Sequence, residues 1–567
     1  MRLGIAIEVL VGGMLLWRIQ AFRPRLPAFT KEDVPYALAI GSTLVVLASC
    51  ALWWPPNNWD SMTYHMARVA QWIQNGSIEF YPTFNHRQLS SPPLAEYTVL
   101  ASCLVSGGDI FANLVQWGCY LLCILSAMEA TGAMGGHRRA MWMAGLLVCS
   151  LPMAILQATS TQNDLVASFF FLCAATELIL MPLNTGWKHP WWTGFWIGAS
   201  VGLGLLTKGT SFLYFPLLLA LGMYQLMARK PWIEAAIAVI LSTAISLAIV
   251  APHSMRQYRN SATILPSEPG QQVEHPTVST FLSIGLRNAA IHLQIPHLVP
   301  RAIVTTNYAT RALSSVNDWL HVDSRSPETS FDPESKAFIP FEIWVHEDYS
   351  GNPLHFVLLL LLLPWSLWIH RKQRSMLASS TRIWIASIIG AAMVLCLLVK
   401  WQVWGSRLHI SLFVASMPVL GMELARIRWA RWLPLLLWAF SWSWIGNNFL
   451  RPWPPPAYLQ QTTRLERMFM ARFALLNGTV RAAGLSDSLA CGRIGLILEG
   501  EAWEYPLHVA TKARVANSRL VHIRPDSTAG YCMIVLSKEV RLPDALRSPE
   551  WVIDSGTAFN FAYPKKK

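Results

Sequence analysis

Two acidic residues stand in polar stretches that interrupt an otherwise apolar sequence of 567 residues. Asp60 lies within residues 55–68 (PPNNWDSMTYHMAR), and Asp164 ends residues 159–164 (TSTQND). A carboxylate at the edge of an apolar segment, close to polar groups, is placed to accept a proton from a hydroxyl group. Each Asp also stands where a helix can begin, and its side chain can then simply cap free backbone amides. The sequence leaves catalysis and capping open for both residues.

Two basic residues occupy similar positions further along the chain. Lys208 lies in residues 205–210 (LLTKGT), and Arg407 ends residues 400–407 (KWQVWGSR). An ammonium and a guanidinium group can hold a phosphate, the guanidinium through two parallel hydrogen bonds. A lysine that only extends toward water, or an arginine that only anchors a helix at the interface, explains these residues equally well. Together, two carboxylates and two cations suit a reaction in which a lipid phosphate leaves and a hydroxyl or amine attacks.

The elements that must position these residues are membrane-spanning helices. Only 14% of the residues are charged and 53% are hydrophobic, which excludes an ordinary soluble enzyme. Each apolar segment is long enough, or nearly so, to cross a hydrocarbon core of about 30 Å. We therefore predict a mainly α, polytopic bundle of about twelve helices, at residues 3–17, 35–54, 110–131, 139–157, 165–181, 191–206, 211–227, 232–250, 354–370, 383–399, 408–425 and 432–446.

Basic residues give this bundle its orientation, because connections rich in Arg and Lys face the cytoplasm. They cluster in alternate connections: Arg18, Arg23, Arg25 and Lys31; Arg138 and Arg139; Lys188; Arg229 and Lys230; Arg371, Lys372 and Arg374; and Arg426, Arg428 and Arg431. The other connections, at 55–109, 158–164, 207–210, 251–353, 400–407 and after 447, are predicted to face outward, as are both termini. The first segment has no small-residue cleavage site, so we expect an uncleaved helix. The net charge of +13 follows from this topology and does not indicate a nucleic-acid surface.

The chain divides into a transmembrane catalytic module at residues 1–447, with large outer loops at 55–109 and 251–353, and a tail at 448–567. Short strand-like runs at 493–498, 520–523 and 532–536 alternate with helix-like stretches in the tail, which indicates a small α/β domain. Seven cysteines lie in or beside apolar segments, whereas Cys491 and Cys532 share the tail. If the tail is extracytoplasmic, these two can pair.

An amphipathic helix is predicted from Asp60 onward. Met62, Met66, Val69 and Ile73 recur at helical spacing, while Arg68, Gln71 and Gln74 lie off this stripe. Such a helix is expected to lie along the membrane interface.

These residues resemble those of the GT-C glycosyltransferase superfamily. The resemblance rests on residues 58–94 (NWDSMTYHMARVAQWIQNGSIEFYPTFNHRQLSSPPL), on STQND ending at Asp164, and on LLTKGT around Lys208. It covers about residues 55–215 well and 341–420 loosely, and is nearest to the branch with aminoarabinose transferase and protein O-mannosyltransferase. It implies a polyprenyl-phosphate sugar as donor, Asp60 as general base, Asp164 as supporting carboxylate, and Lys208 and Arg407 as phosphate ligands. Many mannosyl relatives carry Asp-Glu in the first loop, whereas Ser61 follows Asp60 here, so the sugar and acceptor stay open.

Further residues are expected to contact the acceptor or the donor, namely Tyr64, His65, Arg68, Arg87, Glu347 and Asp348. The segment 346–355 (HEDYSGNPLH) is the main alternative metal site. The chain has no Asp-x-Asp triplet of the kind that clamps a diphosphate through a divalent cation. We therefore expect a donor with one phosphate, and neither a metal nor another cofactor.

The predicted function is inverting sugar transfer from a polyprenyl phosphate to a glycan, lipid or protein acceptor at the outer face of the cytoplasmic membrane. A ligase or oligosaccharyltransferase with a metal-bound diphosphate donor is one alternative. A transporter or flippase of lipid-linked sugar is another, although such proteins usually show internal repeats and charges inside their spans.

Overall fold

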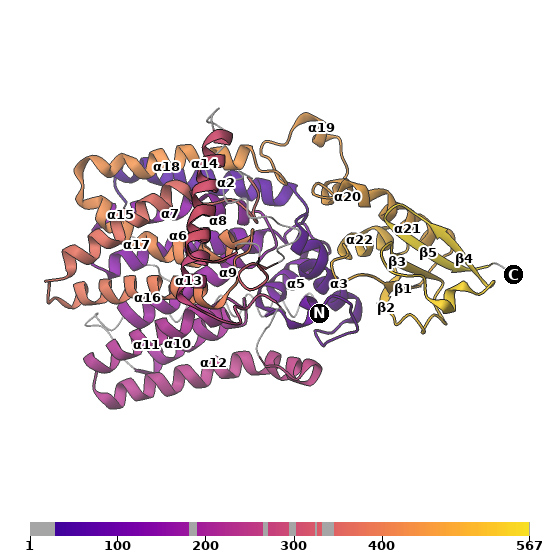
Figure 1. Ribbon diagram of the computed structural model, residues 1–567, viewed down its shortest axis with the longest axis horizontal. Coiled ribbons are helices and arrows are strands. Elements are labelled where there is room, and N and C mark those ends of the chain that lie inside the picture. The colour runs from indigo at the N-terminus through magenta and orange to yellow at the C-terminus, as the bar shows by residue number, and fades with distance from the viewer. Residues whose placement is uncertain are drawn as a thin grey trace.

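A helical bundle joined to a small C-terminal α/β domain makes up the protein (Figure 1). The computed structural model describes residues 29–180, 190–264, 270–293, 302–323, 326–331 and 345–565. The predicted fold class, a polytopic helical bundle with a C-terminal α/β domain, is confirmed.

Seven helices within the described residues are long and apolar enough to cross a membrane. Six of them are α2 (Val34–Trp53), α6 (Leu114–Ala133), α11 (Ser211–Arg229), α12 (Trp232–Ser261), α15 (Pro353–His370) and α16 (Met376–Leu398). The seventh joins the 3₁₀ turn Gly405–His409 to α17 (Ile410–Arg426). Of the twelve expected segments, these account for seven, and the segment at 3–17 lies outside the described residues.

The remaining four expected segments form shorter helices: α7 (Arg138–Cys149), α9 (Asp164–Ala175), α10 (Pro190–Leu205) and α18 (Leu433–Gly446). The segment expected at 139–157 is divided, because Pro152 cannot continue α7 and instead starts a second helix, α8 (Pro152–Gln157). Residues 165–180 form α9 followed by a π-helical turn, Thr176–Leu180.

The helix α17 forms the centre of the bundle and is buried over most of its length. It packs against α7, α9, α15 and α16. At Gly421 a side chain would meet the Cβ of Ala144 at 2.7 Å, so glycine permits α17 and α7 to approach closely. Gly198 does the same between α10 and α12, where an added Cβ would lie 2.7 Å from the Ser242 carbonyl oxygen. These contacts hold α10 and α17 in the bundle; Lys208 follows the C-terminal end of α10, and Arg407 precedes the N-terminal end of α17.

The first large loop folds into a π-helical turn (Ser61–His65) and the helices α3 (Met66–Asn75), α4 (Arg87–Ser90) and α5 (Leu94–Ser106). The predicted amphipathic helix is present, but protein covers its apolar face. Met62, Met66 and Val69 are buried with Phe469 and Trp503 of the C-terminal region. The tail packs on this stripe, so these three side chains contact protein, and the location of the helix along the membrane interface stays a prediction. The other large loop contains α13 (Val278–Ile291) and α14 (Ala302–Trp319).

The C-terminal domain contains a five-stranded sheet in the order β2-β1-β3-β5-β4. The strands β1 (Arg493–Ile497), β2 (Arg519–His522) and β3 (Met533–Ser537) are parallel and match the three predicted runs. The strands β4 (Trp551–Ser555) and β5 (Phe559–Pro564) add an antiparallel pair. Two helices belong with the sheet, α21 (Leu476–Ser488) and α22 (Tyr505–Arg514), whereas α19 (Ala457–Gln460) and α20 (Arg464–Met468) lie in the segment that leads to it from the bundle. Figure 1 shows α20 and α22 between the sheet and the first loop.

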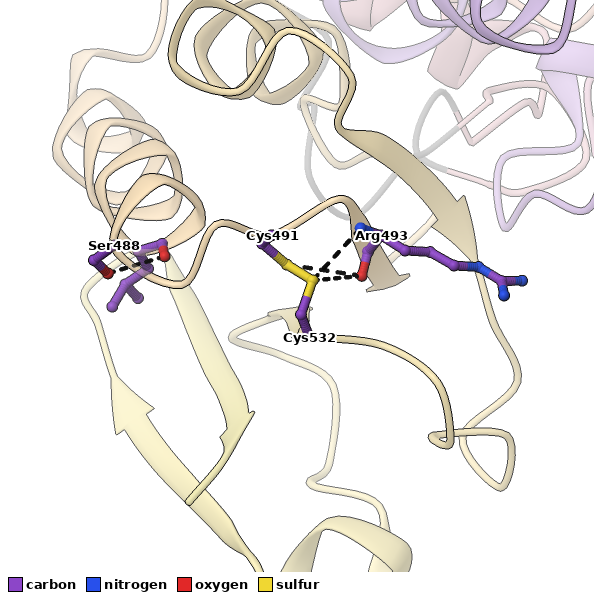
Figure 2. The surroundings of a disulfide bond; sticks show 5 residues. Ser488, Cys491, Arg493 and Cys532 are labelled. Carbon is purple, nitrogen blue, oxygen red and sulfur yellow. Dashed lines mark hydrogen bonds between the residues drawn. A yellow bond between two sulfur atoms is a disulfide. The ribbon is translucent and has the colours of Figure 1, made fainter. Parts of the chain in front are cut away.

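A disulfide joins Cys491 and Cys532, which lie directly before β1 and β3 (Figure 2). The backbone N–H of Arg493 donates a hydrogen bond to the Cys532 sulfur at 3.4 Å. The cross-link closes a separation of 41 residues and ties together the starts of two neighbouring parallel strands. Pairing of these two cysteines, which the sequence left open, is present in the structure.

Candidate active site

Five connections that were predicted to face the same side of the membrane meet at one cavity of about 480 Å³. This volume is within the range of small-molecule sites. The charged residues that line the cavity are Asp60, Arg87, Asp164, Lys208 and Arg407. Tyr64, His65, Gln162, Gln271, Gln272 and Gln402 add polar groups. All four residues predicted to perform the chemistry therefore face a common space.

The Asp60 carboxylate is buried and accepts hydrogen bonds from three side chains. Arg407 Nη1 donates at 2.5 Å, Tyr64 Oη at 3.2 Å and Arg87 Nη1 at 3.4 Å. Its side chain makes no capping bond to the following turn. That role belongs to Asn58, whose Oδ1 accepts the backbone N–H of Ser61 at 2.7 Å. Asn58, and not Asp60, therefore caps this turn.

Electrostatics keep Asp60 ionised. Burial alone would raise the pKa of this carboxyl group, but the guanidinium groups of Arg407 and Arg87 outweigh burial and hold the pKa well below its usual range. A carboxylate of this kind is a weak base as long as both cations stay in place.

Asp164 and Lys208 form the second charged pair of the cavity. Lys208 Nζ donates a hydrogen bond to Asp164 Oδ1. Asp164 is the first residue of α9, and its carboxylate suits the positive end of this helix, yet neither it nor Asn163 caps α9 through its side chain. Within the described residues, Asp164 Oδ2 is buried without a hydrogen-bond partner. Burial lowers the pKa of the Lys208 ammonium group despite the opposing effect of Asp164.

Asp348 supports Arg407 from behind the cavity. Its Oδ1 lies 3.2 Å from Arg407 Nη1 and accepts a hydrogen bond from Gln162 Nε2 at 2.7 Å. Burial, together with the Asp60 and Glu347 carboxylates, raises the pKa of Asp348 even though Arg407 lowers it. Two carboxylates therefore share Arg407. A donor phosphate would have to compete with them for this guanidinium group.

The other residues expected to contact substrate divide into two groups. Tyr64, His65 and Arg87 line the cavity, and the Arg87 guanidinium lies 4.6 Å from the centre of the Tyr64 ring. Arg68 does not line it; this buried side chain donates to the backbone carbonyls of Gln88 at 2.5 Å, Arg87 at 2.6 Å and Ser91 at 3.0 Å. It therefore supports the turn that carries Arg87.

Glu347 also lies away from the cavity and is fully buried. Its Oε1 is 2.8 Å from Arg451 Nη2. Burial would raise the pKa of this carboxyl group, but Arg451 outweighs burial and holds the pKa below its usual range.

The C-terminal domain supplies residues that the sequence did not indicate. Glu501 pairs with Arg87 and accepts a hydrogen bond from Trp59 Nε1 at 2.8 Å. Glu504 is buried and accepts from Gln71 Nε2 at 2.8 Å and from Gln88 Nε2 at 2.7 Å. No local pattern marks these contacts, because their partners are more than 400 residues apart in the chain. The domain thereby reaches the cavity through Arg87.

The described residues contain no group of three or more His, Cys, Asp or Glu side chains arranged to hold a metal ion. In the segment considered as the alternative metal site, His346 Nδ1 accepts the backbone N–H of Asp348 at 3.1 Å, while Glu347 points to Arg451. His346 Nδ1 also lies 3.6 Å from Asp348 Oδ2, whereas Glu347 and His355 are directed to other partners.

Apolar side chains also line the cavity: Phe212 and Leu213 of α11, Leu398 of α16, Val399 and Leu408. Residues 271–273 line it as well and pair with the end of α16, where Val273 N–H donates to the Leu398 carbonyl at 3.0 Å. The cavity therefore offers both charged and apolar surface, as an amphiphilic ligand requires.

These features define a multi-pass membrane protein with a charged cavity at the ends of its helices. Its fold is similar to that of ArnT from Cupriavidus metallidurans, which confirms the predicted resemblance at the level of the fold. The structure of ArnT bound to undecaprenyl phosphate superimposes with a TM-score of 0.52 and 12% identity, over 93% of this chain and 97% of ArnT. The apo state of ArnT gives the same coverage and TM-score, with 14% identity.

A further structure, the S. cerevisiae protein O-mannosyltransferase Pmt1-Pmt2 complex bound to the sugar donor, matches 42% of this chain and 35% of that chain. Its TM-score of 0.33, at 13% identity, does not indicate a shared fold. No family model and no curated protein matches the sequence.

Proposed function

We propose that this protein is a GT-C type glycosyltransferase that moves a sugar from a polyprenyl phosphate to an acceptor. The observation that carries the proposal is the cavity, in which Asp60 shares a space with three cations and with apolar side chains. A lipid phosphate sugar likewise combines an anionic head with an apolar chain. The ArnT fold supports the proposal, since one ArnT structure holds undecaprenyl phosphate.

In the proposed mechanism the donor phosphate competes with Asp60 for its cations. A phosphate that binds Arg407 and Arg87 draws both guanidinium groups away from the carboxylate, and the pKa of Asp60 then rises toward a value suited to a base. Asp60 accepts the proton of the acceptor hydroxyl or amine. The acceptor oxygen or nitrogen attacks the anomeric carbon as the bond from this carbon to the phosphate oxygen breaks. The electron pair stays on the departing polyprenyl phosphate, and the configuration at the anomeric carbon inverts.

Asp164 and Lys208 form the second part of the proposed site. Lys208 stabilises the phosphate as its negative charge grows, and Asp164 keeps the ammonium group charged and in place. The proposal includes no metal ion or cofactor.

We place the reaction at the outer face of the cytoplasmic membrane. The basic connections support this orientation, and so does the disulfide, because disulfides persist mainly in oxidising compartments. Single cysteines at the exposed positions Ser77 and Ser488 should react with an impermeant maleimide in intact cells, whereas one at Lys372 should react only after lysis. The reverse labelling would contradict the orientation.

The transfer itself is tested with the purified protein in nanodiscs and a panel of radiolabelled polyprenyl-phosphate sugars, each offered with membrane extract as acceptor. The expected result is sugar transfer that persists in EDTA. Transfer that needs Mg²⁺ or Mn²⁺ and a diphosphate donor would favour the ligase alternative. Movement of the labelled lipid between leaflets without transfer would favour a flippase.

A further inference from the structure

Arg451 is a buried cation at the point where the chain leaves α18 for the C-terminal domain, and 1% of its surface is exposed. Its Nη1 donates to Asn57 Oδ1 at 2.6 Å, and its Nε donates to Thr159 Oγ1 at 3.0 Å. Its Nη2 lies 2.8 Å from Glu347 Oε1. One guanidinium group therefore contacts three connections that come from different parts of the chain.

Two of these contacts, those to Asn57 and Thr159, involve residues that lie close to Asp60 or to its neighbour Ser61. Asn57 precedes Asn58, whose side chain caps the turn that begins beside Asp60. Thr159 is two residues from Thr161, and the hydroxyl oxygens of Thr161 and Ser61 are 2.5 Å apart. The first and second connections are thus joined twice, once through Arg451 and once next to Asp60.

The third contact, with Glu347, connects Arg451 to Arg407 through Asp348. Glu347 precedes Asp348, which lies 3.2 Å from Arg407 Nη1. The backbone carbonyl of Glu347 accepts a hydrogen bond from Gln157 Nε2 at 2.9 Å. Displacement of Glu347 would therefore also move the neighbouring Asp348 carboxylate, which shares Arg407 with Asp60.

An arginine suits this place for a physical reason. Its planar fork offers five donors in fixed directions, so acceptors on three segments can be satisfied only in one relative arrangement. A lysine supplies the charge but not the fork. Arg451 itself does not line the cavity, so it can act on the reaction only through other residues.

We propose that Arg451 is a positioning residue that sets the relative arrangement of the three connections around Asp60, a role that rests on the proposed transfer reaction. Replacing Arg451 alone would leave the Glu347 carboxylate buried and unpaired, which destabilises a protein whatever its function. The informative variant is the double substitution Arg451→Met/Glu347→Gln, because it removes both charges together.

For this double variant we expect a thermal midpoint near that of the wild type, a kcat reduced at least tenfold and a donor KM within threefold. Arg451→Lys keeps the pair with Glu347 and is expected to fold normally, yet to recover less than a third of the wild-type kcat. If the Arg451–Glu347 pair served only stability, every variant with the stability of the wild type would also keep its activity. A wild-type kcat in the double variant or in Arg451→Lys would overturn the proposal.

A second measurement does not depend on the transfer activity. Cysteines introduced by Ser61→Cys and Thr161→Cys should form a disulfide quickly under mild oxidation, and mass spectrometry of the linked peptides gives the rate. We expect the rate to fall at least tenfold when Arg451→Met/Glu347→Gln is added. An unchanged rate would overturn the positioning role, whether or not the protein transfers sugar. If the wild type transfers no sugar but the rate falls as expected, the proposed function fails and the arrangement by Arg451 stands.

The matched control removes another ion pair at the junction with the C-terminal domain. Arg464 Nη2 lies 2.8 Å from Asp109 Oδ1, and neither residue lines the cavity. Arg464→Met/Asp109→Asn is expected to keep the wild-type kcat and cross-linking rate. Equal losses in this control would overturn the proposal, because they would show that any weakening of the junction has the same effect.

Discussion

Replacing Asp60 with asparagine keeps the shape of the side chain and removes its charge and its ability to take a proton. If Asp60 is the base of sugar transfer, kcat should fall by about 10² to 10⁴, which corresponds to about 2.7 to 5.5 kcal/mol in the activation barrier. The donor KM should change much less, because Arg407 and Arg87 remain available for the phosphate.

The same substitution should cost little stability. Breaking a buried ion pair usually costs about 3 to 5 kcal/mol, because one charge is left without a partner. Here Arg407 keeps Asp348 at 3.2 Å, Arg87 keeps Glu501, and the asparagine oxygen still accepts a hydrogen bond. We therefore expect a loss of only about 1 to 2 kcal/mol in the free energy of unfolding.

The assay is initial-rate transfer in nanodiscs at saturating donor, with thermal unfolding measured on the same samples. Asp348→Asn is the matched control, since it removes a second carboxylate from Arg407 without changing the cavity wall. It should reduce kcat by less than about tenfold, well below the loss expected for the base. If Asp60→Asn keeps more than a tenth of the wild-type rate, the barrier has risen by less than about 1.4 kcal/mol and the assignment of Asp60 as base is refuted.

Three further predictions concern the cations, the domain junction and the disulfide. Lys208→Ala and Arg407→Ala should each weaken donor use by about 2 to 4 kcal/mol, and Arg407→Lys should not fully rescue it, because the fork is lost; normal donor kinetics in either alanine variant would leave that residue as an anchor only. The pKa of Glu504 is held well below its usual range, since His522 and His508 outweigh burial, so its contribution to the junction is complete above about pH 4.3 and is lost as the pH falls through the depressed pKa. Protease cleavage between residues 452 and 463 should therefore increase on acidification in the wild type, and a Glu504→Gln variant that shows the same pH dependence would contradict this. Replacing Cys491 and Cys532 by alanine should lower the stability of the C-terminal domain by about 4 kcal/mol for a separation of 41 residues, as measured by denaturant unfolding of the full chain, and an unchanged midpoint would contradict the estimate.

The sequence predicted those strands whose burial makes them continuous apolar runs. The strands β1, β2 and β3 are parallel, and their residues are mostly buried, so they stand out as short hydrophobic segments. The strand β4 lies at the edge of the sheet and is partly exposed, and β5 includes the polar Asn560. Their residues are largely apolar but do not form a continuous buried run, and β5 joins the sheet by pairing with β3 while β4 pairs with β5.

The convergence of Asp60, Asp164, Lys208 and Arg407 was predictable because alternate connections of a helical bundle share one face. Their partners were not predictable. Arg87 pairs with Glu501 and Gln88 with Glu504 across more than 400 residues, and such contacts leave no periodic or local signal in the sequence. For the same reason the sequence predicted an amphipathic helix from Asp60 onward but did not indicate that the tail covers Met62, Met66 and Val69.

In the proposed mechanism, the charge balance of the reaction explains why Asp60 is paired with cations. A polyprenyl-phosphate sugar is a phosphodiester with one negative charge, and the departing polyprenyl phosphate carries two until it is protonated. Asp60 loses its negative charge when it takes the acceptor proton, so the total charge of the site stays constant while one negative charge moves from the carboxylate to the phosphate. Arg407, which lies 2.5 Å from Asp60, can follow that movement with a small displacement. A low dielectric surrounding makes this compensation more valuable, because an uncompensated charge in the cavity would cost several kcal/mol. The proposed mechanism therefore accounts for an arrangement in which the base is paired before the donor arrives.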